Sequence, residues 1–295
     1  MIVIPSVYLG IDIGGTSTKY ALVDSCGNIY QRNSFNTGMS ISKKVFLERL
    51  LSVSNEGILQ GASGIGICSL GVVNADTGEI LGAAENLPFL EGVNLRKELQ
   101  KTLPKFPVYV CNDVHAVAKG ERWLGAAKNV KNYFCMALGT GLGGALVIDS
   151  KLVEGSHYRA GEIGYLDYYG EHDYIEKYVS TSAVMKLASD KLGEENIDGF
   201  RFFELIREGN IICNNILDKW TEKLSRIIAN LIITLDLELI LISGGVSNEK
   251  EILIPIIVSK VDYMLPSSFR GQTRICAAAF GNDAGILGAV SDFFV

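Results

Sequence analysis

Apolar and polar positions along this chain predict two similar α/β halves. Short apolar runs bounded by glycine or turn residues are typical of buried strands, whereas apolar residues spaced three or four apart are typical of helices. In the first half, this pattern predicts strand, strand, strand, helix, strand, helix and strand at residues 7–13, 19–23, 29–36, 42–59, 64–70, 95–103 and 107–111. The first two strands form a hairpin around a glycine-containing loop.

The second half repeats part of this order. Strands are predicted at 133–138, 145–148, 239–243 and 274–278, and helices at 116–124, 210–236, 250–264 and 284–293. Pro255 predicts either a kink in its helix or a later helix start. The repeated order predicts a duplicated α/β fold of the ribonuclease-H-like, actin-like ATPase type, with two lobes and a central cleft. We expect an N-terminal lobe at 1–113 and a C-terminal lobe at 114–283, with a final helix at 284–295 packing back on the first lobe.

Two glycine-bearing loops lie in corresponding hairpins, at Asp12-Ile13-Gly14-Gly15-Thr16-Ser17-Thr18-Lys19 and at Leu138-Gly139-Thr140-Gly141-Leu142-Gly143-Gly144. Glycine lets backbone N–H groups close around an anion because no Cβ is in the way. One such loop can be a plain tight turn, but two suggest lobes that face one polyphosphate. The residues predicted to bind the nucleotide are Asp12, Gly14, Gly15, Thr16, Thr18, Lys19, Gly139, Thr140, Gly141 and Gly143. Lys19 could instead point to solvent.

Composition excludes several classes of protein. The 295 residues are 48% hydrophobic and 20% charged, which favours a packed globule over disorder. A net charge of −6 argues against a nucleic-acid partner, because phosphate binding needs clustered Lys and Arg. The six cysteines show no metal or redox spacing and fit buried positions in a reducing compartment. Asp236 and Glu238 interrupt the apolar stretch 231–242, so no membrane span is expected there. We expect a cytoplasmic protein.

The order of further motifs resembles the ROK family of repressors, open reading frames and sugar kinases. Besides the two glycine loops, the resemblance depends on Gly64-Ile65-Gly66-Ile67, Glu85-Asn86-Leu87-Pro88, Cys111-Asn112-Asp113, Ala160-Gly161-Glu162-Ile163-Gly164, Ser243-Gly244-Gly245-Val246 and Gly281-Asn282-Asp283-Ala284-Gly285. It covers residues 10–289. Each motif alone is weak, but their joint order and spacing are specific.

The resemblance implies an ATP-dependent carbohydrate kinase that phosphorylates a hexose hydroxyl, with Mg²⁺ as cofactor and often a dimer or tetramer; we expect a homodimer. It also implies that Asp12 holds Mg²⁺ through water and that Gly244 and Gly245 lie against the adenosine. The repressor branch carries an N-terminal helix-turn-helix domain. The predicted first strand begins at residue 7, so we expect the kinase branch.

Asp113 is the predicted catalytic base. It follows a predicted strand and precedes a predicted helix, where a carboxylate could accept the proton of the sugar hydroxyl. The alternative is a helix N-cap, a position that Asp favours. The resemblance implies sugar contacts from Asn86, Asn112, Asp113, Glu162 and Glu176, and carboxylate and amide groups suit vicinal hydroxyls.

The chain departs from the family after Glu162. Most members have a histidine where Tyr165 stands, followed by a cysteine-rich, zinc-binding run. Residues 166–175 contain no cysteine, and only His157 and His172 are nearby, so we expect no structural zinc.

Members with tyrosine at this position resemble β-glucoside kinases, so we expect Tyr165 to contact a hexose or β-glucoside phosphorylated at its 6-hydroxyl. A glucokinase or an N-acetylhexosamine kinase is the alternative. A non-catalytic sugar-sensing protein and an actin-like ATPase are alternatives of other classes. The exact sugar, the nucleotide preference, the oligomeric state and the regulation do not follow from the sequence.

Overall fold

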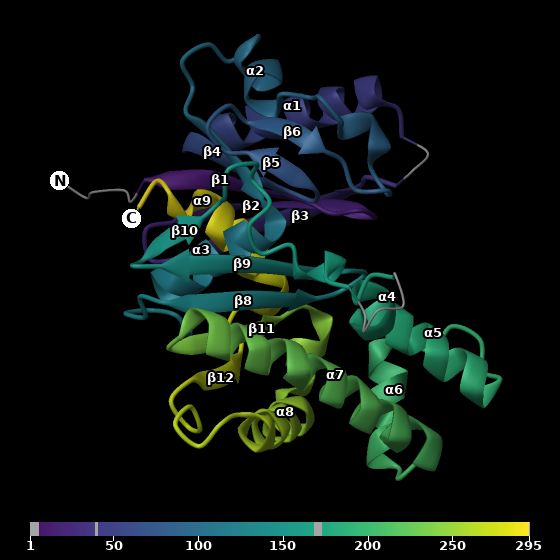
Figure 1. Cartoon of the computed structure of the whole chain (residues 1–295). Coiled ribbons are helices and arrows are strands. Elements are labelled where there is room, and N and C mark those ends of the chain that lie inside the picture. Colours follow the sequence, from purple (N-terminus) through teal and green to yellow (C-terminus); the bar gives the residue numbers. More distant parts are fainter. Residues whose placement is uncertain (1–5, 39–40, 168–172, 295) are drawn as a thin grey trace. The chain divides into compact units, whose positions relative to one another are not determined.

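The computed structural model of the chain describes residues 6–38, 41–167 and 173–294 (Figure 1). The chain divides into two compact units. Unit 1 comprises Met1–Gly125, Ser156–Arg159 and Asp283–Val295, and unit 2 comprises Ala126–Gly155 and Ala160–Asn282. The first division therefore falls after Gly125 rather than after Asp113, and the last helix belongs to unit 1.

Unit 1 is built around a five-stranded sheet of order β3-β2-β1-β4-β7. β1 pairs antiparallel with β2 and parallel with β4, and β7 extends the parallel part. The strands are β1 Val7–Ile13, β2 Ser17–Asp24, β3 Ile29–Asn36, β4 Ala62–Ser69 and β7 Val108–Asn112. The other elements of this unit are α1 Lys43–Leu59, β5 Val72–Asn74, β6 Glu79–Gly82, η1 Pro88–Leu90, α2 Leu95–Gln100, α3 Asp113–Leu124, η4 Gly281–Asp283, of which only Asp283 belongs to unit 1, and α9 Ala284–Ser291.

The two faces of β1 are covered by different helices (Figure 1). Leu9, Ile11 and Ile13 are buried in one core cluster with Phe46 and Leu50 of α1. Successive side chains of a strand point to opposite faces, so the intervening residues of β1 face α9. A Cβ at Gly10 would lie 2.8 Å from Cγ2 of Ile286, which explains the small residue. The helices α3 and α9 also approach closely, because a Cβ at Gly288 would overlap the carbonyl oxygen of Ala116.

Unit 2 repeats the same sheet order. Its sheet is β10-β9-β8-β11-β12, antiparallel through β8 and parallel from β8 to β12. The strands are β8 Tyr133–Leu138, β9 Leu142–Ile148, β10 Lys151–Val153, β11 Leu239–Ser243 and β12 Arg274–Ala277. The other elements are η2 Ile163–Tyr165, α4 Glu176–Val179, α5 Thr181–Leu192, α6 Gly199–Arg207, α7 Ile211–Leu235, η3 Gly245–Glu249 and α8 Lys250–Met264. The predicted class, an α/β fold of two ribonuclease-H-like halves, is confirmed.

Several predicted elements differ from the structure in their bounds. Helix α7 ends almost where the pattern predicts, with Asn210 as N-cap and Asp236 as a left-handed C-cap. Pro255 lies inside α8, whose start at Lys250 precedes the proline. Helix α3 begins three residues before the predicted start, because Asn112 caps it. Among the described residues, no helix is long and apolar enough to cross a membrane.

Candidate active site

The carboxyl ends of the parallel strands bring the predicted residues of unit 1 to one sheet edge. In the parallel register, Asp12 of β1 is beside Cys68 of β4, which in turn is beside Cys111 of β7. One residue further, Asn112 ends β7 and is followed directly by Asp113. Parallel strands that end together are a common location for ligand-binding side chains in α/β sheets.

Asp12 lies in a largely desolvated position. Its Oδ1 accepts a hydrogen bond from the thiol of Cys68 at 3.4 Å, and a Cβ at Gly285 of α9 would lie 3.1 Å from Oδ2. Burial raises the pKa of the Asp12 carboxyl, while the hydrogen bond from Cys68 and the charge of Lys19 lower it in part. Lys19 is directly opposite Asp12 on β2, so the two side chains share a face of the sheet. An anion that is desolvated in this way is suited to a cation.

The first glycine loop has its own support. Thr16 is exposed at the tip, and its carbonyl oxygen accepts the backbone N–H of Thr37 at 2.9 Å. A Cβ at Gly15 would lie 2.9 Å from Nδ2 of Asn86, so Asn86 lies against this loop. Thr18 is fully buried, and its hydroxyl is 3.3 Å from that of Thr37. This placement gives the Thr18 side chain a role in holding the hairpin, and it does not support the predicted nucleotide contact of that side chain.

The side chain of Asn112 makes four hydrogen bonds, one of which is to the carboxylate of Asp113. Oδ1 of Asn112 accepts the backbone N–H groups of Val114 and His115 at 2.9 and 3.0 Å, which makes Asn112 the N-cap of α3. Nδ2 of Asn112 donates to Oδ1 of Asp113 and to the carbonyl oxygen of Gly71, both at 2.9 Å. The N-cap of α3, which was the alternative role predicted for Asp113, is therefore provided by Asn112. These four bonds use the full hydrogen-bonding capacity of an amide side chain.

The second glycine loop connects β8 and β9 in unit 2. Leu138 pairs with Leu142, so Gly139, Thr140 and Gly141 form the tip, whereas Gly143 lies within β9. Gly244 follows β11 with φ of +95°, and a Cβ there would overlap the carbonyl oxygen of Leu138. Only glycine satisfies both conditions. Gly244 is thus brought to the base of the loop, and Gly245, the next residue, is exposed.

Of the remaining predicted residues of unit 2, Glu176 contacts the loop itself, and Glu162 follows a glycine that packs on β9. Gly161, with φ of +93°, packs against the backbone of Gly144 and places Glu162 next to β9. Oε2 of Glu176 accepts the backbone N–H of Leu142 at 2.7 Å. Tyr165 is 64% exposed and meets Tyr174 edge to face, with ring centroids 5.1 Å apart.

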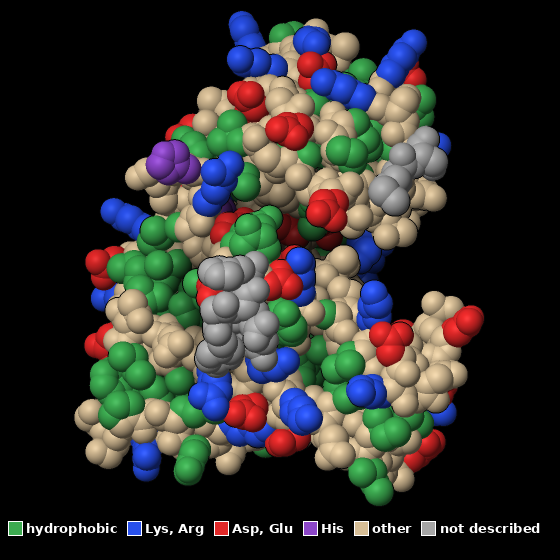
Figure 2. Space-filling model, turned by 45° about the vertical axis from the view of Figure 1, so that its right-hand side comes forward, with side chains coloured by type: hydrophobic (Ala, Val, Ile, Leu, Met, Phe, Trp, Pro, Cys, Tyr) green, Lys and Arg blue, Asp and Glu red, His purple; other side chains and the backbone are tan. Residues whose placement is uncertain are grey.

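Among the described residues, no group of three or more His, Cys, Asp or Glu side chains is arranged to hold a metal ion. His157 is exposed in unit 1, and His172 lies outside the described residues. The absence of zinc stays a prediction. On the face shown in Figure 2, Lys and Arg side chains are scattered among acidic and neutral ones.

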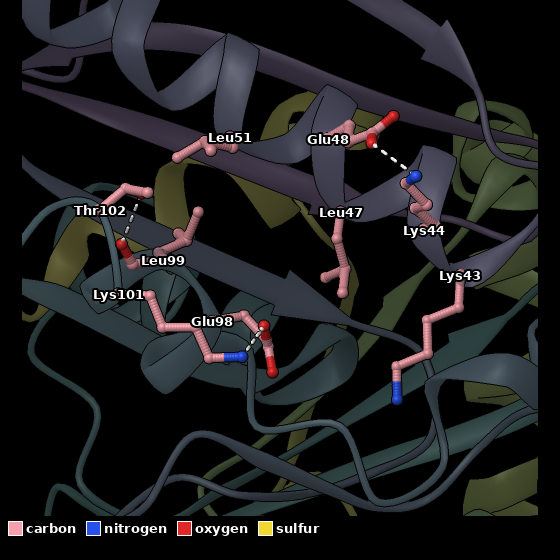
Figure 3. Close-up of a pocket in the computed structure, with 9 residues that line it drawn as sticks. All are labelled: Lys43, Lys44, Leu47, Glu48, Leu51, Glu98, Leu99, Lys101 and Thr102. Atoms are coloured by element: carbon pink, nitrogen blue, oxygen red, sulfur yellow. Dashed lines mark hydrogen bonds and ion pairs between the residues drawn. The ribbon is translucent and has the colours of Figure 1, made fainter.

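A separate groove of about 560 Å³ lies between α1 and the end of α2 in unit 1 (Figure 3). Lys44 pairs with Glu48 at 3.9 Å and Lys101 pairs with Glu98 at 2.6 Å along its rim. None of the predicted site residues lines this groove.

Two residues that the sequence did not single out touch the predicted ones. In the sequence, Cys68 is one more apolar residue of a predicted buried strand, so the apolar pattern gives no indication of its hydrogen bond to Asp12. Ser182 donates through Oγ to the carbonyl oxygen of Thr140 at 2.5 Å. The sequence indicates the helix start near Ser182, because Ser180, two residues earlier, is a favourable N-cap residue and directly precedes α5.

Comparison with known proteins agrees with this arrangement. Residues 8–292 match the model of the ROK family. A glucokinase of Thermotoga maritima is 30% identical over 96% of this chain and 96% of its own length. A β-glucoside kinase of Listeria monocytogenes is 26% identical over 96% of this chain and 95% of its own. The chain belongs to the ROK family, and the predicted class, an ATP-dependent sugar kinase of that family, is confirmed.

A solved structure shares the fold. The ROK-family glucokinase of Streptomyces griseus, in complex with glucose and AMPPNP, aligns with a TM-score of 0.84 and 24% identity. The alignment covers 98% of this chain and 99% of that one.

Proposed function

We propose that this chain transfers the γ-phosphoryl group of ATP to the 6-hydroxyl of a hexose or a β-glucoside, with Asp113 as general base. The observation that carries the proposal is the 2.9 Å hydrogen bond from Nδ2 of Asn112 to Oδ1 of Asp113. A hydrogen bond to the charged form favours that form and fixes the direction of the carboxylate. Asp113 then accepts the proton of the sugar hydroxyl as the hydroxyl oxygen attacks the γ-phosphorus and the bond to the β-phosphate oxygen breaks.

The two glycine loops would bind the nucleotide phosphates through backbone N–H groups, with the hydroxyls of Thr16 and Thr140 at their tips. Gly244 and Gly245 would accept the adenosine. Asn86, Asn112, Glu162 and Glu176 would bind the sugar. Because Asn112 already uses all its bonds, a sugar contact by Asn112 requires one of them to be exchanged.

Asp12 would hold a hydrated Mg²⁺, because its half-buried carboxylate lies near the end of β1 beside the first glycine loop, and burial raises its pKa, so that a nearby cation would favour the ionised form. Bound Mg²⁺ supplies charge neutralisation for the phosphates in phosphoryl transfer. Lys19, which is opposite Asp12 on β2, would add a positive charge on the same face of the sheet.

The choice of a β-glucoside over free glucose follows from Tyr165 and Tyr174. These side chains are 64% and 51% exposed and form an edge-to-face pair, and Tyr174 lies two residues before Glu176 in the sequence. An exposed aromatic pair offers an apolar surface on which the substituent at C1 of a sugar can pack. The similarity to a β-glucoside kinase supports this choice, and the similarity to a glucokinase supports the alternative.

The test of the base is Asp113→Asn. The variant keeps the size of the side chain but removes the proton acceptor, so we expect turnover to fall by at least about 10²-fold with sugar binding retained. Release of ADP is measured with and without sugar. Near-normal turnover of the variant would remove Asp113 from the mechanism, and release of ADP by the wild type without sugar would favour an ATPase.

The test of the substrate compares kcat/KM on glucose, cellobiose and N-acetylmannosamine. We expect cellobiose to be the best of the three and Tyr165→Ala to lower its kcat/KM more than that of glucose. Equal or better rates on glucose would contradict the preference for a glucoside. We further propose a cytoplasmic homodimer, to be checked by light scattering and by fractionation.

A further inference from the structure

The backbone of the second glycine loop is held from one side by two neighbouring helices of unit 2. Glu176, the first residue of α4, accepts the N–H of Leu142 through Oε2 at 2.7 Å. Ser182, near the start of α5, donates its N–H to the carbonyl oxygen of Gly139 at 3.3 Å and its Oγ–H to that of Thr140 at 2.5 Å. Residues of α4 and α5 therefore fix the orientation of three consecutive peptide groups, from the carbonyl of Gly139 to the N–H of Leu142.

Two glycines make room for the Glu176 carboxylate. A Cβ at Gly141, in the loop, would overlap Oε2 of Glu176. A Cβ at Gly164, in η2, would lie 3.1 Å from the same oxygen and 2.5 Å from the carbonyl oxygen of Leu142. Gly141 has no left-handed φ, so its backbone alone does not require glycine. The carboxylate thus occupies the space of a side chain at Gly141, whereas at Gly164 the carbonyl oxygen of Leu142 is the closer obstacle.

The charge of Glu176 has a cost that needs a compensating benefit. A carboxylate beside a loop that binds polyphosphate repels the ligand by Coulomb's law. Its bond to a backbone N–H, by contrast, is a charge-assisted hydrogen bond, which is among the stronger ones in proteins. We propose that Glu176 is a positioning residue that holds the loop in the conformation that binds nucleotide phosphates. This inference depends on the proposed role of the loop, and a sugar contact of Glu176 would use Oε1, the other oxygen.

The test measures binding of AMPPNP with Mg²⁺ to the full chain in the absence of sugar, so that any sugar contact of Glu176 has no influence. Glu176→Ala removes the acceptor of the Leu142 N–H, and we expect the Kd to rise by roughly tenfold or more. Glu176→Gln keeps an acceptor oxygen and removes the repelling charge, so its Kd should equal or fall below that of the wild type. A raised Kd for Glu176→Ala beside an unchanged or lowered Kd for Glu176→Gln would not arise from a merely structural role.

A control on the same segment is Asp173→Ala. Asp173 pairs with Lys177 at 2.7 Å and supports α4 without a bond to the loop among those described here. This variant should leave the Kd for AMPPNP unchanged. If it weakens binding as much as Glu176→Ala, loosening of α4 rather than the Leu142 bond is the cause, and the inference fails.

A second variant keeps the inference testable if Glu176→Ala does not fold. In Gly141→Ala, the new methyl group displaces the carboxylate, so the Kd should rise as well. Where both variants fold, the Kd of the double variant for AMPPNP should not exceed that of the weaker-binding single variant, because both substitutions break the same contact. Unchanged binding by Gly141→Ala, or additive losses, would overturn the inference. A wild type that does not bind AMPPNP would instead contradict the proposed function.

Discussion

The thiol of Cys68 donates a hydrogen bond to Oδ1 of Asp12 at 3.4 Å and lies 3.5 Å from the carbonyl oxygen of Gly285. One buried side chain thus connects the middle parallel strand of unit 1 to the carboxylate proposed to face Mg²⁺ and to the C-terminal helix.

Replacing Asp12 should raise the stability of the protein and abolish its Mg²⁺-dependent activity. Burial raises the pKa of the Asp12 carboxyl, so at neutral pH the ionised group costs the native state free energy without a cation. Asp12→Asn removes that cost, and we expect a higher Tm than the wild type at pH 7 in EDTA, together with loss of Mg²⁺-dependent turnover. A lower Tm would mean that the Cys68 bond outweighs the desolvation.

The cysteines should differ in reactivity. Burial, followed by the charges of Asp12, Cys111 and Asp113, raises the pKa of the Cys68 thiol well above its usual value, which suppresses the thiolate. Cys26 is exposed. With iodoacetamide at pH 7.5 and mass spectrometry, we expect Cys26 to be modified in the native protein and Cys68 only after unfolding. Modification of Cys68 at a rate similar to that of Cys26 would show that the interior of unit 1 opens readily.

His115 should make unit 1 sensitive to acid. Burial, with a smaller effect from the charge of Lys119, lowers the pKa of His115 from 6.5 to about 4. Between these values the unfolded chain binds the proton and the native chain does not, so stability is complete above pH 6.5 and falls as pH drops toward 4.

The difference between the two pKa values of His115 corresponds to a loss of roughly 3 kcal/mol in the free energy of unfolding. Urea unfolding at pH 7 and pH 4.5 measures this loss, and His115→Gln should remove most of the pH dependence. An equal dependence in the variant would assign it to other groups.

Close packing of α9 should make Gly288 intolerant of a side chain. A Cβ there would overlap the carbonyl oxygen of Ala116, so Gly288→Ala forces α3 and α9 apart and should cost about 1–3 kcal/mol or more. Gly199, the first residue of α6, has nothing within 4 Å of the equivalent position. Gly199→Ala is the matched control and should be neutral or stabilising. Urea unfolding compares the two, and equal stability would show that α9 can shift at little cost.

Local patterns explain which parts of the fold were predictable. Both glycine hairpins follow from apolar runs that flank a glycine turn, and α7 follows from helical spacing bounded by Asn210 and Asp236. The segment from α4 to α6 was not predicted, because Ser180, Gly193 and Asp198 cap short helices there. Short elements carry too few residues for a clear period.

The site shows the same limit. The candidate site residues could be predicted because their motifs are local, but the residues that contact them in the structure are distant in the chain. Leu142 and Glu176 are 34 residues apart, and Asp12 and Cys68 are 56 apart. Spacing along the chain contains no information on such pairs, so the bond of Cys68 to Asp12 emerged only from the structure, and Ser180 signalled only the helix start near Ser182.

The last helix of the chain completes the unit that the first strand begins. Every residue of α9 is buried, and its partners in β1, β4 and α3 are synthesised more than 150 residues earlier. During translation, unit 1 therefore lacks part of the cover of its sheet until residues 284–291 have been synthesised, whereas all strands of unit 2 precede α9 in the chain. A truncation that removed α9 would therefore leave unit 1 with an exposed apolar surface, open to aggregation or proteolysis.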